Sequence, residues 1–301
     1  MAAIATDRRG FSHRQKRGIA HGFVHAVLIT VSAACALPLL LILAASLTDE
    51  AALVRQGFRL IPLQVTLDAY RFLFNDPAQI VRAYGVSTFV TIVGASVSLF
   101  LMSMLAYALS RRDFALRQAI SFFIFFPALF SAGMVPFYIL MVRTLGLKDN
   151  ILALILPPLV IPFFVLLLRT YFSTIPKDLI DAARIDGASE FLIYFRVVLP
   201  LSTPALATVG LFSLLFYWND LYLSLLFIND RNLYNLQYLL FQIISNIQLL
   251  EDSFVSQGMK PPLQSVRMAM AVLAMGPMLF AFMFVQRFFV KGITLGGLKG
   301  D

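Results

Sequence analysis

The sequence has few of the residues from which disulfides, metal sites and hydrolytic centres are built. It contains one cysteine, Cys35, and three histidines that all lie within the first 25 residues. A single cysteine cannot form a disulfide framework or a multi-cysteine metal site. An intramembrane enzyme would need paired acids or histidine ligands within its spans, and with all three histidines in the first 25 residues we expect no such site. Cys35 lies in an apolar run, where we expect it to act as a small apolar residue.

Charged residues are also scarce. They make up 13% of the 301 residues, against about 25% in soluble domains, whereas hydrophobic residues make up 59%. A mean hydropathy of +0.82 cannot be hidden inside one water-facing domain of this size. The sequence therefore predicts an all-α integral membrane protein without a large soluble domain.

Six apolar runs set the expected architecture. Each is long enough to cross a bilayer as a helix of about 20 residues. They cover residues 22–47, 84–109, 119–142, 151–171, 204–228 and 268–289. Prolines within the third and fourth runs predict bent helices. We expect the six helices to form one permease domain over residues 22–290.

The basic residues fix the expected orientation. They gather in the tail 1–21, in the short turn after the second run and in the tail 291–301, so the positive-inside rule places both termini in the cytoplasm. Residues 172–203 then form a cytoplasmic loop, and residues 229–266 form an outer loop. We interpret the net charge of +8 as a topology signal in a protein surrounded by lipid, and we expect no nucleic-acid partner.

The cytoplasmic loop predicts two short helices joined at a glycine. Pro176 suits a first helical turn, and Gly187 suits a helix end. Helical spacing places Leu179, Ala182 and Ala183 on one face of the first helix, and Lys177, Asp181 and Arg184 on the other. Ser189 can cap the second helix, which Pro200 ends. An interfacial helix on the lipid headgroups is one interpretation. The two alanines favour a protein partner instead, because small residues allow close approach.

A family resemblance rests on this loop and on the C-terminus. The run Asp181-Ala182-Ala183-Arg184-Ile185-Asp186-Gly187-Ala188, followed by Val197-Val198-Leu199-Pro200, resembles the "EAA" loop of permease subunits of bacterial ABC importers. It departs where Asp181 replaces Glu and Val197 replaces Ile. Residues 286–300 resemble the ending of carbohydrate-type permeases of the maltose kind. Phe289-Val290-Lys291-Gly292 is closest to the subgroup for complex oligosaccharides such as alginate or pectin fragments.

The resemblance implies a type I ABC importer permease fold in the bacterial cytoplasmic (inner) membrane. It implies that the glycine-hinged helices are the coupling helix, seated in a cleft of an ATP-hydrolysing subunit, and that the ATP-binding subunits form a dimer. The implied coupling residues are Asp181, Ala182, Ala183, Arg184, Asp186, Gly187, Ala188, Leu199 and Pro200. Further implied partners are a second permease, expected to be a different chain, a solute-binding protein at the outer loop, and an oligosaccharide substrate. No Walker sequence is present, so we expect ATP to be used by the partner subunits and no cofactor to bind this chain.

The fifth run holds the other candidate site, Tyr217-Trp218-Asn219-Asp220. An ionisable residue within a span is costly and is a functional candidate by default. In one interpretation these residues line a water-filled translocation path that sugars follow. In the other, Asn219 and Asp220 bond neighbouring helices, or lie near the outer interface where Trp218 and Tyr222 form an aromatic belt. A self-powered secondary transporter remains the alternative function. It would need internal repeats and buried coupling-ion groups, whereas we find no convincing repeat and Asp220 is the only acid placed within a span.

Overall fold

The computed structural model describes residues 13–62, 64–130, 132–256 and 263–296, with the backbone alone for 13–21, 247–256, 285 and 287–296. The predicted basic tails, 1–21 and 291–301, therefore lie outside the described side chains. The described residues are helical or irregular, and pair as β-structure at one isolated bridge between Thr48 and Val65. The chain divides into two compact units, residues 1–72 with 262–272 and the remainder.

The first unit contains α1 (His13–Ser46), α2 (Glu50–Gln56) and the start of α15 (Leu263–Gly296). Residues 22–46 of α1 are apolar enough to cross a membrane, and residues 22–40 are exposed along the whole stretch. Glu50 joins α2 to α15, because its carboxylate accepts hydrogen bonds from the backbone N–H groups of Gln264 and Ser265 at 2.9 and 2.8 Å. Such a cap satisfies free N–H groups at a helix start. The short helix α3 (Asp68–Leu73) leads to the second unit.

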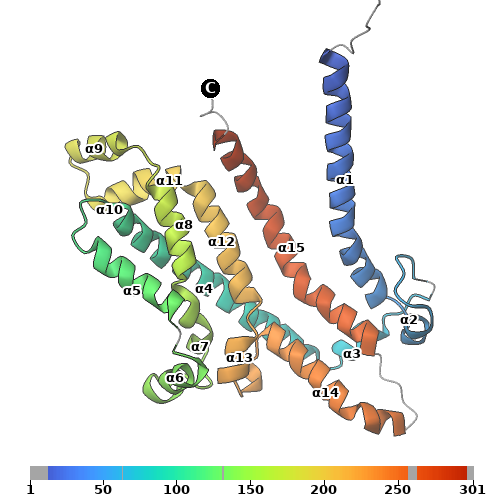
Figure 1. Ribbon diagram of the computed structural model, residues 1–301. Helices are drawn as coiled ribbons and strands as arrows, with labels where there is room; N and C mark the ends of the chain where they lie inside the picture. The colour runs from blue at the N-terminus through green and yellow to red at the C-terminus, as the bar shows by residue number, and fades with distance from the viewer. Residues whose placement is uncertain (1–12, 63, 131, 257–262, 297–301) are drawn as a thin grey trace, which may run out of the picture. The chain divides into compact units, whose positions relative to one another are not determined.

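The longest helix of the second unit is α4 (Pro77–Ser110) (Figure 1). The Asp76 side chain caps it by accepting from the Gln79 N–H, and Pro77 occupies its first turn. At 1.5 Å per residue it is about 50 Å long, more than the roughly 30 Å hydrocarbon core of a bilayer. It begins at Pro77, before the predicted start at residue 84, because caps rather than hydropathy set helix ends.

Two predicted spans are broken rather than gently bent. The third consists of α5 (Arg117–Leu129), α6 (Met134–Ile139) and η1 (Leu140–Thr144), with a bend of 116°. Gly133 lies at the break with φ +85°, a conformation that side chains disfavour. The fourth consists of α7 (Leu152–Ile155), η2 (Pro157–Leu159) and α8 (Pro162–Phe172), with a bend of 46° where prolines remove backbone donors.

The rest of the second unit follows α8. The loop helices are α9 (Lys177–Ile185), α10 (Glu190–Ile193), η3 (Tyr194–Val198) and α11 (Leu199–Leu201), and they lead into α12 (Thr203–Trp218), α13 (Tyr222–Phe227), η4 (Arg231–Leu233) and α14 (Leu236–Ser256). By length and composition, four described helices could cross a membrane, or up to six if each bent pair is one span. The number of six spans and the side of each terminus stay predictions.

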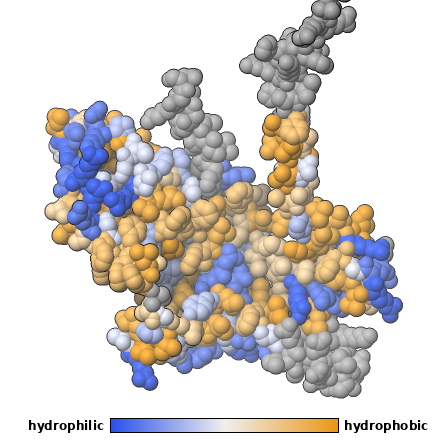
Figure 2. All heavy atoms as spheres, viewed as in Figure 1, coloured by the Kyte–Doolittle hydropathy of each residue, from blue (hydrophilic) through white to orange (hydrophobic). Residues whose placement is uncertain are grey.

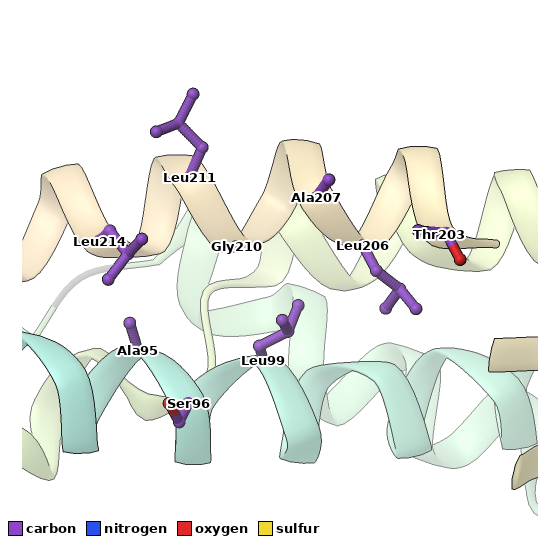
Figure 3. Close-up of a pocket in the computed structure, with 9 residues that line it drawn as sticks. All are labelled: Ala95, Ser96, Leu99, Thr203, Leu206, Ala207, Gly210, Leu211 and Leu214. Atoms are coloured by element: carbon purple, nitrogen blue, oxygen red, sulfur yellow. The ribbon is translucent and has the colours of Figure 1, made fainter. Parts of the chain in front are cut away.

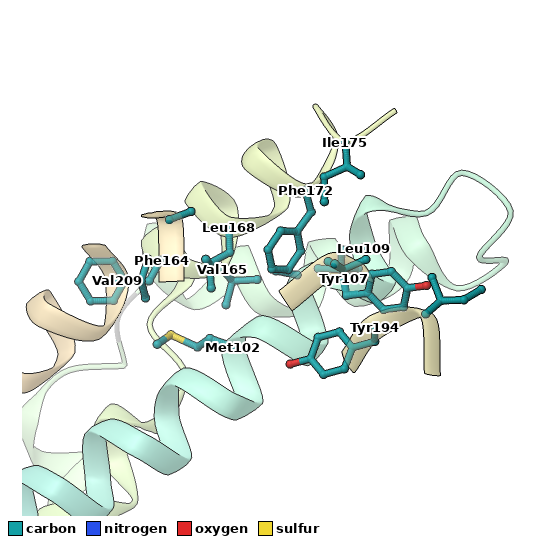
Figure 4. Packing of buried hydrophobic residues seen from close by; sticks show 14 of the residues in the cluster. Met102, Tyr107, Leu109, Phe164, Val165, Leu168, Phe172, Ile175, Tyr194 and Val209 are labelled. Carbon is teal, nitrogen blue, oxygen red and sulfur yellow. The ribbon is translucent and has the colours of Figure 1, made fainter. Parts of the chain in front are cut away.

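The core of the second unit lies where α4, α8 and α12 meet (Figure 4). Met102 of α4, Leu168 of α8 and Val209 of α12 are fully buried there. The same cluster includes Ile180 of α9 and Ile193 of α10. The loop helices are therefore attached directly to the core of the membrane-spanning helices.

Candidate functional site

The turn between α9 and α10 has the hydrogen bonds of a Schellman motif. The Ala188 N–H donates to the Ala183 carbonyl at 2.9 Å, and the Gly187 N–H donates to the Arg184 carbonyl at 3.0 Å. This closure needs a left-handed residue just after the helix. Gly187 supplies it with φ +81°. The spacing from Ala183 to Gly187 and Ala188 in the sequence motif is therefore the spacing of a helix end.

The second helix of the loop, α10, has a side-chain cap at its start. The Ser189 hydroxyl accepts from the Leu192 N–H, as predicted for a cap. The chain then continues through η3 and α11 into α12. Leu199 packs against the core, whereas Pro200 is exposed in the first turn of α11. Pro200 does not end the helical segment, because proline is tolerated in a first turn.

The main contact of α9 with the core belongs to neither predicted face. Ile180 is buried and Ala183 is half-buried against the core, whereas Ala182 and Asp181 are exposed. Leu179, placed by spacing with Ala183, is 47% exposed instead. The reason is that α9 uses Ile180 as its anchor, which rotates the alanine pair so that one member faces inward and the other outward.

Charged residues fasten this loop to the end of α4. The Arg184 guanidinium donates to Asp113 Oδ2 at 2.8 Å and to Glu190 Oε1 at 2.9 Å through Nε. Arg111 donates to Asp113 at 3.1 and 3.2 Å. The Tyr107 hydroxyl of α4 donates to Glu190 Oε2 at 2.6 Å. These five residues form a continuous network from α4 through α9 to α10, and Figure 2 shows hydrophilic residues gathered at the α9 end.

The network keeps its acids ionised. Hydrogen bonds from Arg184 and Arg111 hold the pKa of Asp113 well below its usual range. Burial raises the pKa of Glu190, but hydrogen bonds from Tyr107 and Arg184 outweigh it, so that pKa lies below its ordinary value. The same carboxylates raise the pKa of Arg184. All three groups are charged near neutral pH, so the network persists there.

Sequence reasoning missed Asp113, Glu190, Arg111 and Tyr107 as members of this site. One signal was available, because Asp113 is the only acid in the otherwise basic turn of residues 111–117. Nothing in the sequence pairs it with Arg184, which lies 71 residues further on.

The four predicted path residues separate into different environments. Tyr217 and Trp218 are each 3% exposed. The Tyr217 hydroxyl donates to the Ile155 carbonyl at 2.9 Å, and Trp218 Nε1 donates to the Ala274 carbonyl at 2.8 Å. Both side chains therefore donate to backbone carbonyls of neighbouring helices.

Asp220 and Asn219 lie in the break between α12 and α13. Asp220 Oδ1 accepts from the Leu223 N–H at 3.2 Å, so this acid caps α13, while its Oδ2 is buried without a partner among the described residues. Asn219 is exposed and uses only its amide nitrogen, which donates to the Leu215 carbonyl. Of the four residues, Asn219 is therefore the exposed one.

A groove of about 350 Å³ lies between α4 and α12 (Figure 3). Ala95 and Leu99 of α4 face Leu206 and Gly210 of α12 across it. Hydroxyl groups come only from Ser96 and Thr203. The groove is suited to apolar side chains or lipid tails, and it lacks the hydrogen-bonding groups that a sugar needs.

The loop helices packed on α4 and the long apolar helices together describe a helical membrane protein. Residues 82–295 match the family described as the inner membrane component of binding-protein-dependent transport systems. The chain belongs to this family, which confirms the resemblance of the motif. It is a multi-pass inner membrane permease of an ATP-driven importer, and the ATPase activity resides in partner subunits. Its partners in general are ATPase subunits and a binding protein.

Relatives cover nearly the whole chain. The polygalacturonan/rhamnogalacturonan transport system permease protein YtcP of Bacillus subtilis is 40% identical over 92% of this chain and 97% of its own length. The arabinooligosaccharides transport system permease protein AraQ of Halalkalibacterium halodurans is 32% identical over 93% and 95%. The crystal structure of a bacterial ABC transporter that imports the acidic polysaccharide alginate contains a chain with a TM-score of 0.76. That chain is 30% identical over 93% of this chain and 99% of its own length.

Proposed function

We propose that this permease imports oligosaccharides, and that the loop helices α9 and α10 are the element through which ATP-binding subunits move it. The observation that carries the proposal is an exposed apolar surface on an otherwise polar loop. Ile185 is 87% exposed, Phe191 is 66% exposed and Leu179 is 47% exposed. Exposed apolar groups with a polar surround are typical of a protein contact.

The Arg184 network gives this contact a mechanical consequence. To shift a two-state pore from 1:99 to 99:1 takes about 5.5 kcal/mol of differential interaction. The loop cannot generate this, because its ion pairs are partly exposed and each contributes about 1 kcal/mol or less. The loop can transmit this free energy, because Arg184 binds Asp113 at the end of α4 and Ile180 is buried in the core. A displacement of α9 is therefore passed to the helices that cross the membrane.

For the substrate, we propose oligosaccharides of the kind that the relatives are named for, with polygalacturonan and alginate fragments as the first candidates. Their path would follow the exposed face of α12 and α13. Phe212, Phe216 and Tyr222 are each about half-exposed there, next to Asn219. Aromatic faces and an amide together suit sugar rings and hydroxyl groups.

The remaining partners follow from the same proposal. A second permease, a different chain, would complete the path, and a solute-binding protein would dock at the outer loop of residues 229–266, which contains α14. ATP would bind only to the paired ATP-binding subunits, and this chain would hold no cofactor. The cytoplasmic side would be the α9 end of α4.

The test is reconstitution of the complete complex, extracted gently from membranes, with its solute-binding protein. Mass spectrometry of the intact complex should find two ATP-binding subunits and two permeases. ATP hydrolysis in proteoliposomes should rise when oligosaccharides from polygalacturonan or alginate are added, and should rise less with neutral arabinooligosaccharides. The binding protein should be required for the rise.

Two results would contradict the proposal. Uptake by the purified chain alone, driven by an ion gradient, would establish the secondary transporter instead. Equal stimulation by every sugar tested would remove the substrate assignment and leave the permease assignment intact.

A further inference from the structure

A second cavity in the same unit lies behind α9. It has a volume of about 420 Å³ and is walled by the end of α4, the start of α5, the end of α8 and α9 itself. Its charged lining is unbalanced, with five cations against two acids. The cations are Arg111, Arg112, Arg117, Lys177 and Arg184, and the acids are Asp113 and Asp181. We call it the basic cavity.

The protein neutralises only part of this charge. Asp113 is shared by Arg111 and Arg184, and Glu190 also binds Arg184. Arg112, Arg117 and Lys177 form no ion pair with any residue that the structure describes. Three cations in the lining of the basic cavity therefore have no ion-pair partner among the described residues, and Asp181 is the single unpaired acid beside them.

The position of Arg117 makes the excess of positive charge around the cavity more unfavourable. Arg117 occupies the first turn of α5, which has no acidic residue and no side-chain cap, so its charge lies at the positive end of the helix dipole. It also repels Arg169 of α8, whose guanidinium donates to the Ser121 hydroxyl at 3.3 Å. An anion in the cavity would relieve both repulsions.

The surroundings indicate which anion. Large apolar side chains are exposed at the end of the basic turn and in α5, with Leu116 at 58%, Phe122 at 68% and Phe123 at 80%. A free phosphate would gain nothing from that surface, whereas the acyl chains of a phospholipid would cover it. Basic pockets between membrane helices on the cytoplasmic side are suited to anionic headgroups.

We propose that the basic cavity binds the phosphate headgroup of an acidic phospholipid from the inner leaflet, with Arg112, Arg117 and Lys177 as its cationic contacts. The inference rests on the proposed function only for the orientation that places this end in the cytoplasm. A headgroup there would lie against both α9 and the end of α4, so it would stabilise the position of the coupling loop.

The experiment uses the complete complex, purified in a neutral detergent and stripped of loosely bound lipid. Short-chain phosphatidylglycerol, the matching phosphatidylcholine and inorganic phosphate are titrated separately. Retained lipid is counted by native mass spectrometry, and stabilisation is followed as the thermal midpoint. We expect phosphatidylglycerol to be retained and to raise the midpoint, phosphatidylcholine to do neither, and salt to weaken the effect.

The variant Arg112→Gln with Arg117→Gln removes two of the three free cations. It should weaken phosphatidylglycerol binding about tenfold or more. The matched control is Arg143→Gln with Lys148→Gln, which removes two exposed charges outside the basic cavity and should bind like the wild type. Arg112→Lys with Arg117→Lys keeps the charge and should restore most of the binding, which separates a lost anion site from a folding defect.

Three outcomes would overturn the proposal. Equal lipid retention by the Gln variant and its control would show that the cavity is not the site. An equal response to inorganic phosphate would make free phosphate the ligand. Loss of the ATPase subunits from the Gln variant with unchanged lipid retention would assign the cations to acidic groups of a protein partner. Lipid retention is read without transport, so failure of the proposed function would not be mistaken for failure of the lipid site.

Discussion

At the scale of single residues, Gly187 determines the shape of the coupling loop. It has φ +81°, and a Cβ built on it would meet nothing within 4 Å. The constraint is therefore conformational and not steric. Left-handed backbone costs an ordinary residue about 1–2 kcal/mol, whereas Asn tolerates it better.

Gly187→Val should consequently disrupt the turn between α9 and α10 and reduce substrate-stimulated ATP hydrolysis several-fold. The reduction by Gly187→Asn should be smaller, between that of the valine variant and none. The control is Gly85→Val, which also adds a side chain in open space but at an ordinary helical position. Stimulated hydrolysis by the reconstituted complex is the measurement. If both valine variants behaved alike, the turn would not be important for coupling.

Two substitutions of Asp220 can distinguish its role as a helix cap from a role of its charge in the translocation path. Asp220→Asn keeps an oxygen that can accept from the Leu223 N–H, so its stability should be close to that of the wild type. Asp220→Ala removes the cap and should cost about 1 kcal/mol. Thermal midpoints and uptake rates are compared for the two variants. Loss of uptake in a stable Asp220→Asn complex would show that the charge itself is needed.

At the scale of elements, α4 and α12 approach closely because a glycine on each helix lies against a side chain of the other helix. A Cβ on Gly94 would lie 2.5 Å from the Tyr217 ring, and one on Gly210 would lie 3.3 Å from the end of Leu99. Tyr217 cannot move aside easily, since it is buried and its hydroxyl is bonded to Ile155. By contrast, the atom of Leu99 nearest Gly210 is a methyl group at the end of a flexible side chain.

Gly94→Ala should therefore destabilise the helix pair by about 1–3 kcal/mol through overpacking. Gly210→Ala, the same change on the partner helix, should be nearly neutral because better helix propensity offsets a small shift. The thermal midpoint of the purified complex distinguishes them. Equal shifts would mean that the two helices are packed less closely than described.

The Arg184 network joins three elements, and its pH dependence follows from Asp113. Because the folded-state pKa of Asp113 is lowered, its contribution to stability is present above its ordinary pKa and is lost as the pH falls through the lowered value. The difference in thermal midpoint between wild type and Arg184→Ala should stay constant from about pH 5 to about pH 8. A difference that faded within this range would contradict the charge states assigned here.

At the scale of the whole molecule, the proposed topology places the two ends of α4 on opposite sides of the membrane. Asp113 and Arg184 mark one end, and Gln79, which donates to the Arg231 carbonyl at 2.6 Å, marks the other. Cysteine labelling can test this, because the chain has only Cys35, which Cys35→Ala removes.

In that background, Arg231→Cys should react with a membrane-impermeant maleimide in intact cells. Ile185→Cys, at a position that is 87% exposed in the wild type, should react only after the inner membrane is opened. Labelling of Ile185→Cys in intact cells would reverse the topology and place the coupling loop outside.

Local patterns predicted some features of the site well. Ser189 and Gly187 act as predicted, because a cap and a helix end depend on neighbours within a few residues. Spacing did not identify Ile180 as the residue of α9 that meets the core, because Ile180 belongs to neither of the two faces that the spacing defines. The burial of Tyr217 depends on Gly94, which is far away in the chain.

By itself the sequence determined that this chain is helical and lies in a membrane, because hydropathy and charge act at every position. Its loop motif also determined the family. Only the tertiary structure decided that Arg184 binds Asp113, that Asp220 caps a broken helix and that three cations share one cavity. Those features depend on which residues, far apart in the sequence, come into contact when the helices pack, and local sequence patterns do not specify these contacts.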